Sequence, residues 1–148
     1  MIQRKQSLWF LISALIAALA YLIPFTVKTT TSIASYEIID HQITAKYDMI
    51  SMLLFALIII FNLIALFLFK NRKQQLTLSF LSILTSIGAF AYEIYFSLKG
   101  GNNIVFGIIG KDIYVGLLIP LICIIFTYMA MRGIQNDVKL LKDTDRLR

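Results

Sequence analysis

The sequence has little charge and almost no cysteine, histidine or proline. Charged residues make up 15% of its 148 residues and hydrophobic residues 59%, whereas a soluble domain carries about 25% charged residues. A soluble fold of this length could not bury so much apolar surface, but a bilayer accommodates it because lipid replaces the missing core. The composition therefore excludes an ordinary soluble domain and predicts a single-domain integral membrane protein, residues 1–148.

The scarcity of reactive side chains limits the chemistry. Cys123 is the single cysteine, so no disulfide forms within the chain. His41 is the single histidine and has no cysteine beside it, which leaves too few ligands for a metal site or for a haem held by two histidines. The sequence contains no phosphate loop, nucleophile elbow or haem attachment motif. We therefore expect no enzyme activity and no cofactor.

Four apolar runs are long enough to cross a membrane. A bilayer core of about 30 Å needs about 20 residues at 1.5 Å each, and the runs cover residues 7–25, 48–69, 76–96 and 113–131. The first run also resembles a secretory signal, but its apolar residues continue to Phe25, so we expect a retained helix. The spans predict an all-α membrane protein, an antiparallel bundle of four transmembrane helices.

The basic residues predict the orientation. Cytoplasmic segments beside spans carry an excess of lysine and arginine, and here this excess lies at the amino end, between the second and third spans, and in the tail. We therefore expect a multi-pass protein of the bacterial inner membrane with both termini in the cytoplasm. The residues on that side are Arg4, Lys5, Lys70, Arg72, Lys73, Arg132, Lys139, Lys142, Arg146 and Arg148, against Lys28, Lys46, Lys99 and Lys111 on the other.

Two outer loops are expected to meet in a small extracytoplasmic cap. The first, residues 26–47, is rich in β-branched residues, and its part 35–46 could pair as a short β-hairpin around Asp40 and His41. The second contains Gly100–Asn103, a strong turn signal. The apolar segment Ile104–Gly110 that follows is too short to span, and could form a strand or dip into the membrane interface.

The sequence also predicts the structure of the inner loop and of the tail. The loop 70–75 is short, so the second and third helices should be antiparallel neighbours. In the tail 132–148, Ile134, Val138 and Leu141 recur at helical spacing, which predicts a helical cytoplasmic tail that continues helix four with a bend near Gly133. Pro120 removes a backbone donor and is expected to kink helix four locally.

Two residues of the predicted spans, Glu93 and Asn62, carry a carboxyl or amide side chain in the span interior. Glu93 is the only acid in the interior of a predicted span, since Asp48 is the first residue of the second one, and an ionisable group there indicates either function, such as a proton or ion relay, or an interfacial position. Because Glu93 is about three residues from the predicted outer end of its helix, we favour contact with water or headgroups, with Lys99 or Lys111 as a partner. Asn62 lies near the middle of helix two, where hydrogen bonding across a helix contact is favoured over a polar pathway.

Short motifs at both ends and in the inner loop share one pattern. They are Met1–Arg4, Gln6–Ser7, Pro24–Phe25, Lys70–Gln74, Asp137–Lys142 and Asp145–Arg148. In order and placement they resemble a family of small Bacteroidota inner-membrane proteins catalogued as domain of unknown function 4293, and the resemblance covers the whole chain. The tail departs from the family pattern at Ile134–Asn136, where a basic residue is usual. The resemblance implies four transmembrane helices and no established activity, cofactor or catalytic residue.

The matching motifs at the amino end, in the inner loop and in the tail lie on the predicted cytoplasmic side, which favours a surface recognised there. We expect a non-enzymatic accessory or stabilising subunit of a larger inner-membrane protein complex, in contact with membrane lipids and not with nucleic acid. Alternatives are a small oligomeric transporter or channel using Glu93 and Asn62, and, as the weakest, a lipid-modifying enzyme using Glu93, Asp48, Asp112 and His41. The candidate contacts for a partner or for anionic lipid are Arg4, Lys70, Arg72, Lys73, Asp145, Arg146 and Arg148.

Overall fold

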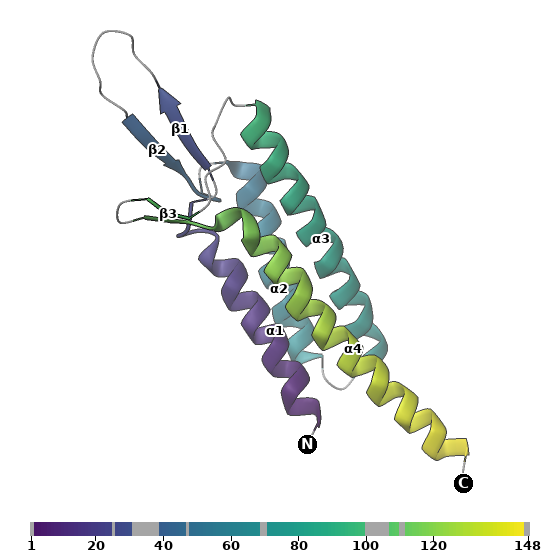
Figure 1. Ribbon diagram of the computed structural model, residues 1–148. Coiled ribbons are helices and arrows are strands. Elements are labelled where there is room, and N and C mark those ends of the chain that lie inside the picture. Colours follow the sequence, from purple (N-terminus) through teal and green to yellow (C-terminus); the bar gives the residue numbers. More distant parts are fainter. Residues whose placement is uncertain are drawn as a thin grey trace.

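Figure 1 shows the computed structural model of the chain, which is built mainly from four helices. The structure describes residues 2–24, 26–30, 39–46, 48–68, 71–99, 107–109 and 112–146. The helices are α1 (Ile2–Leu19), α2 (Met49–Phe67), α3 (Arg72–Lys99) and α4 (Ile119–Arg146), with the short 3-10 helix η1 (Gly116–Leu118) before α4. The strands are β1 (Thr26–Thr30), β2 (Ile39–Ile43), β3 (Gly107–Ile109) and β4 (Asp112–Tyr114).

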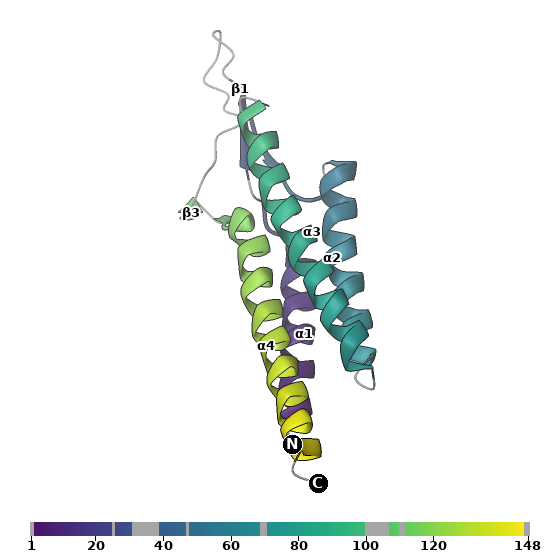
Figure 2. The same ribbon diagram turned by 90° about the vertical axis from the view of Figure 1, so that its right-hand side faces the viewer.

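The helices lie side by side, and neighbours run in opposite directions (Figures 1 and 2). Helix α1 packs against α2 and α4, and α3 packs against the same two helices. The start of α1, the end of α2, the start of α3 and the end of α4 gather at one end of the bundle, which we call the terminal end. The strands lie at the opposite end, which we call the sheet end. The antiparallel order of α2 and α3 agrees with the prediction from the short inner loop.

Three of the described helical segments are long and apolar enough to cross a membrane. They are Met49–Phe67, Arg72–Lys99 and Gly116–Leu140, the last being η1 with most of α4. The apolar part of α1, Gln6–Leu19, is shorter. Large apolar side chains such as Leu15, Leu84 and Ile125 point outward and are more than half exposed. These properties indicate a membrane protein, as the composition predicted.

The interior of the bundle is rich in small and polar side chains. Small residues let membrane helices approach closely, and polar ones hydrogen-bond across the contact because lipid offers them no partner. The buried faces follow helical spacing, with positions three or four residues apart along α2 and α3. The buried side chains of α2 are Ser51, Phe55, Ile58, Asn62 and Ala65, and those of α3 are Gln75, Ser79, Ser82, Ser86, Ala89, Glu93 and Ser97.

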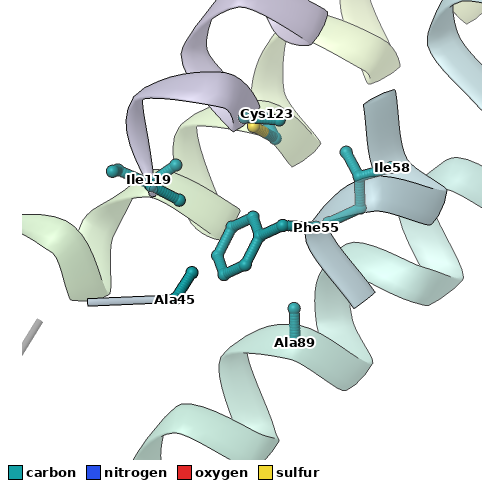
Figure 3. Packing of buried hydrophobic residues seen from close by; sticks show 8 residues of the cluster. Ala45, Phe55, Ile58, Ala89, Ile119 and Cys123 are labelled. Carbon is teal, nitrogen blue, oxygen red and sulfur yellow. The ribbon is translucent and has the colours of Figure 1, made fainter. Parts of the chain in front are cut away.

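The main apolar core lies toward the sheet end (Figure 3). Phe55 is fully buried there among Ala89 of α3 and Ile119 and Cys123 of α4. Ala45, in the link between β2 and α2, is also fully buried in this cluster. The chain outside the helices therefore covers this end of the core. Cys123 is a free, buried thiol that packs in this cluster.

Helix boundaries differ from the predicted spans at several ends. The first helix was expected to reach Phe25, but α1 ends at Leu19 and the next residues form a tight turn, in which Leu22 N–H bonds to the carbonyl of Leu19. Such three-residue spacing is common where a helix ends. Helix α3 extends beyond the predicted 76–96 to Arg72 and Lys99, because hydropathy marks the apolar part of a helix and not its polar ends.

The start of helix four was placed too early. Residues 113 and 114 belong to β4, and helical structure begins at Gly116. Pro120 is the second residue of α4 and follows η1 directly, so it lies at the start of this helix and not in its middle. Helix α4 then continues without a break through Gly133 to Arg146, so the tail extends the helix.

Two small antiparallel sheets form the sheet end. Strand β1 pairs with β2, and β3 pairs with β4. The predicted turn at Asp40 and His41 is wrong, because both residues lie inside β2 and pair with Thr29 and Lys28. The partner strand is β1, residues 26–30, which lies outside the predicted hairpin 35–46. The predicted turn at Gly100–Asn103 lies outside the described residues.

Candidate functional site

Three helices are joined by side chains at the terminal end. Gln6 of α1 donates a hydrogen bond through Nε2 to Oδ2 of Asp137 of α4 at 2.7 Å. The same oxygen lies 3.5 Å from the guanidinium of Arg72, the first residue of α3. Gln6 and Asp137 are buried and Arg72 is about three-quarters buried, so solvent competes little for these contacts. We call these three residues the terminal clasp.

Gly133 makes room for the clasp. A Cβ at this position would lie 2.9 Å from Cγ of Gln6, which is closer than carbon atoms approach without displacement. The absence of a side chain thus lets Gln6 lie against α4, one turn before Asp137. Gly133 thus marks a close approach of a neighbouring side chain to α4.

Helix α2 is tied to α3 at the same end. Gln75, one turn after Arg72, donates through Nε2 to the carbonyl of Ala65 at 2.9 Å. Gln75 is buried, and Ala65 belongs to the apolar cluster of Phe10, Ala130 and Ile134. All four helices therefore meet in polar contacts near the terminal end.

A second set of polar contacts crosses the middle of the bundle. Oγ of Ser13 on α1 and Oγ1 of Thr127 on α4 are 3.0 Å apart. Thr127 donates to Oδ1 of Asn62 on α2 at 3.2 Å, and Nδ2 of Asn62 donates to Ser82 on α3 at 2.9 Å. One continuous hydrogen-bonded chain thus contacts all four helices, and we call it the central chain.

Asn62 uses its amide fully within the protein. Its Nδ2 also donates to the carbonyl of Ile58, so both amide protons have acceptors, and its oxygen accepts from Thr127. The prediction that Asn62 bonds across a helix contact is confirmed. Two hydroxyls of α3 are also bonded within the protein. Ser79 and Ser86 each donate to the backbone carbonyl four residues earlier in the same helix.

Glu93 lies in a different environment from the one expected. Its side chain is 1% exposed, and neither carboxylate oxygen has a hydrogen-bond partner in the structure. The interfacial prediction is wrong, because α3 continues six residues beyond Glu93 and its side chain lies on the buried face of that helix. Lys99, one of its predicted partners, instead lies over the ring of Tyr95, and Lys111 is outside the described residues.

Asp48 has a structural role at the start of α2. Its carboxylate accepts from the backbone N–H groups of Ile50 and Ser51, which caps the helix. The same oxygen accepts from the hydroxyl of Tyr92 on α3 at 2.7 Å. These contacts fix α2 against α3 at the sheet end. The side chains of His41 and Asp112, the other acids and bases weighed for a lipid enzyme, lie outside those described.

The structure describes the side chains of only two of the predicted contact residues, Arg72 and Lys73. Arg72 is in the terminal clasp, and Lys73 beside it is exposed. Asp145 and Arg146 belong to the last turn of α4. The side chains of these two and of Arg4, as well as the whole of Lys70 and Arg148, are outside the description.

Sequence reasoning missed the mutual contacts of Gln6, Arg72 and Asp137. Each lies in a different motif of the family resemblance, and these motifs were interpreted only as an outward-facing surface. A charged residue on an otherwise apolar helical face is the signal that could have found Asp137, since it follows Ile134 by three positions on the buried side of α4.

Together, the outward apolar faces and the internal polar contacts define a membrane-type helical bundle. The chain belongs to the family described as Domain of unknown function (DUF4293), whose match covers residues 2–147. No curated protein and no solved structure shows significant similarity to it. Among the described residues, no three histidine, cysteine, aspartate or glutamate side chains are grouped as metal ligands would be.

Proposed function

We propose that the chain is a non-enzymatic accessory or stabilising subunit of a larger inner-membrane protein complex. In this proposal all four helices span the membrane and both termini are cytoplasmic. The observation that carries it is the terminal clasp, because Asp137 holds residues from the amino end, the inner loop and the tail together. Segments far apart in the sequence thereby form one basic surface that a partner can recognise.

Contacts along α1 support the fourth span. Gln6 lies level with Asp137, Ser13 with Thr127, and Ala17 packs in the same cluster as Cys123. Helix α1 thus runs beside the apolar segment Gly116–Leu140 for most of that segment's length. The 18 residues of α1, Arg4 and Lys5 included, correspond to about 27 Å, and the apolar part Gln6–Leu19 to about 21 Å.

The charge distribution supports the orientation and the partner surface. Lys73, Arg132 and Lys139 are exposed toward the terminal end. Basic residues beside spans are retained in the cytoplasm, and each attracts anionic lipid by about 1 kcal/mol. Anionic lipid could therefore bind this surface in place of a protein, and the test must distinguish the two.

The test is a pull-down of the tagged chain, expressed at native level and extracted in mild detergent, with mass spectrometry of the captured proteins and lipids. A stoichiometric membrane protein, lost when Asp145–Arg148 are deleted, is the expected result. Lys46→Ala and Lys99→Ala are matched controls, because both are exposed lysines toward the sheet end. A chain recovered alone, or with lipid only, would contradict the proposal.

A small oligomeric transporter or channel is the second candidate, and the burial of an unpartnered Glu93 favours it. Asn62 is the other residue of that hypothesis. Both of its amide protons are donated within the bundle, so in a transporter it would hold the helices together and not contact the transported ion. Flux into proteoliposomes that is lost in Glu93→Ala would support transport, and inert proteoliposomes would count against it.

A further inference from the structure

Three buried polar side chains toward the sheet end have no hydrogen-bond partner. They are Glu93 and Ser97 on α3 and Ser51 on α2, and each is at most 1% exposed. Buried hydroxyls and carboxylates are nearly always bonded, and an exception in a native structure calls for an explanation. In contrast, the hydroxyls of Ser79, Ser82 and Ser86 on the same face of α3 all take part in hydrogen bonds.

The register of α2 and α3 brings Ser51 and Glu93 to one level. Asn62 and Ser82 are hydrogen-bonded across the two helices. Ser51 lies 11 positions before Asn62, and Glu93 lies 11 positions after Ser82. Since 11 residues make about three turns and return to the same face, Ser51 and Glu93 occupy corresponding positions on antiparallel neighbours. Ser97 is one further turn along the face of Glu93.

The described charged groups nearby form no hydrogen bond or ion pair with Glu93. Lys99 lies over the ring of Tyr95, 5.5 Å from its centroid. Asp48 accepts from Tyr92 and from the backbone at the start of α2. Lys46, in the link before α2, is exposed. The one ion pair in the described part of the chain is Arg72–Asp137, at the other end of the bundle.

A buried, unpaired carboxylate is strongly unfavourable unless a cation or a proton accompanies it. Two carboxylate oxygens and two hydroxyl oxygens form a hard-oxygen donor set, the kind that alkali and alkaline-earth ions prefer. Calcium takes six to eight oxygens and commonly several carboxylates. The single negative charge here instead matches a single positive charge.

We propose that Glu93, Ser97 and Ser51 bind a monovalent metal cation between α2 and α3, with the Glu93 carboxylate as the charged ligand and the two hydroxyls as neutral ones. Sodium is the probe of choice because it is small and favours oxygen ligands. The bound ion would fasten α3 to α2 beyond the central chain. This site is independent of the accessory-subunit proposal, since binding requires neither a partner nor transport.

The test measures the thermal unfolding midpoint of the full chain in detergent, in choline chloride and in sodium chloride of equal concentration. We expect sodium to raise the midpoint by about 4 °C when it exceeds the dissociation constant tenfold. Glu93→Gln should abolish this shift, and Ser97→Ala should reduce it. Ser86→Ala is the matched control and should respond like the unmodified chain, because its hydroxyl bonds only within its own helix.

An equal midpoint in both salts for the unmodified chain would overturn the proposal and indicate a protonated carboxyl. An undiminished sodium shift in Glu93→Gln would overturn it as well, because sodium would then act at another place. If Glu93→Gln fails to fold, retention of radioactive sodium decides the matter with the serine variants. Binding that falls in Ser51→Ala and Ser97→Ala but not in Ser86→Ala supports the site. Equal binding in all three, or none in the unmodified chain, contradicts it.

Discussion

Gln6 and Asp137 are 131 positions apart in the sequence, and a 2.7 Å hydrogen bond joins their side chains at the terminal end of the bundle. This contact connects the first and last helices, and Arg72 adds the third helix through the same carboxylate. The basic segments at this end are thus held in fixed relative positions. A recognition surface made of several segments requires such an arrangement.

Removing the shared carboxylate should loosen the terminal end. In Asp137→Ala, Gln6 loses its acceptor and Arg72 its counter-charge, so we expect a loss of about 1–2 kcal/mol in the free energy of unfolding. Asn136→Ala is the matched control, because Asn136 is the exposed neighbour on the same helix. Unfolding of both variants in detergent measures the difference, and equal stabilities would exclude a stabilising clasp.

Gly88 of α3 and Gly133 of α4 should respond in opposite ways to alanine. Gly133→Ala places a methyl group against Gln6 and should destabilise the chain, with less effect when Gln6→Ala is already present. Gly88→Ala meets no atom within 4 Å, so it should be neutral or stabilise by up to about 1 kcal/mol through helix propensity. A double-mutant cycle on Gly133 and Gln6 measures the coupling. Additive effects would show that the two residues do not interact.

The central chain should depend on Asn62 more than on the hydroxyls around it. Asn62→Leu leaves Thr127 and Ser82 without their shared partner and should cost about 1–2 kcal/mol. Ser79→Ala is the control, since its hydroxyl donates only to the carbonyl of Gln75 in the same helix. Thermal unfolding compares the variants. A larger loss in Ser79→Ala than in Asn62→Leu would contradict the role of the chain.

The proposed orientation makes a labelling prediction. A cysteine at Lys46, an exposed residue at the sheet end, should react in intact spheroplasts with a membrane-impermeant maleimide. A cysteine at Lys73, toward the terminal end, should react only after permeabilisation. The native Cys123 is fully buried and should give little background. The reverse labelling pattern would invert the orientation, and equal labelling would exclude four spans with a cytoplasmic terminal end.

Composition and hydropathy were sufficient to predict the helical membrane architecture and the order of the helices. Their boundaries were less accurate, because hydropathy detects the apolar part of a helix and is blind to polar turns such as those at Arg72 and Lys99. The pairing of β1 with β2 could not be predicted from the sequence. Residues 26–30 and 39–43 pair across a segment outside the described residues, whereas a local turn signal favoured Asp40 and His41.

The partners and the burial of polar residues in the spans could be predicted only in part. Asn62 was predicted to bond across a helix contact because a lone amide in a span needs a partner, and this is confirmed by Ser82. Its second partner, Thr127, could not be predicted, because the contact crosses the bundle and depends on how the helices are rotated. Glu93 was placed near water from its distance to a span end, but the rotation of α3 decides its burial.

Site-specific photo-crosslinking in cells tests the central claim most directly, that the terminal end is a surface recognised by another membrane protein. A photoreactive residue replaces either Lys73, exposed at the terminal end, or Leu84, exposed on the outward apolar face of α3. The account predicts a discrete protein adduct from position 73 and no such adduct from position 84. Adducts from neither position, or from position 84 alone, would contradict it.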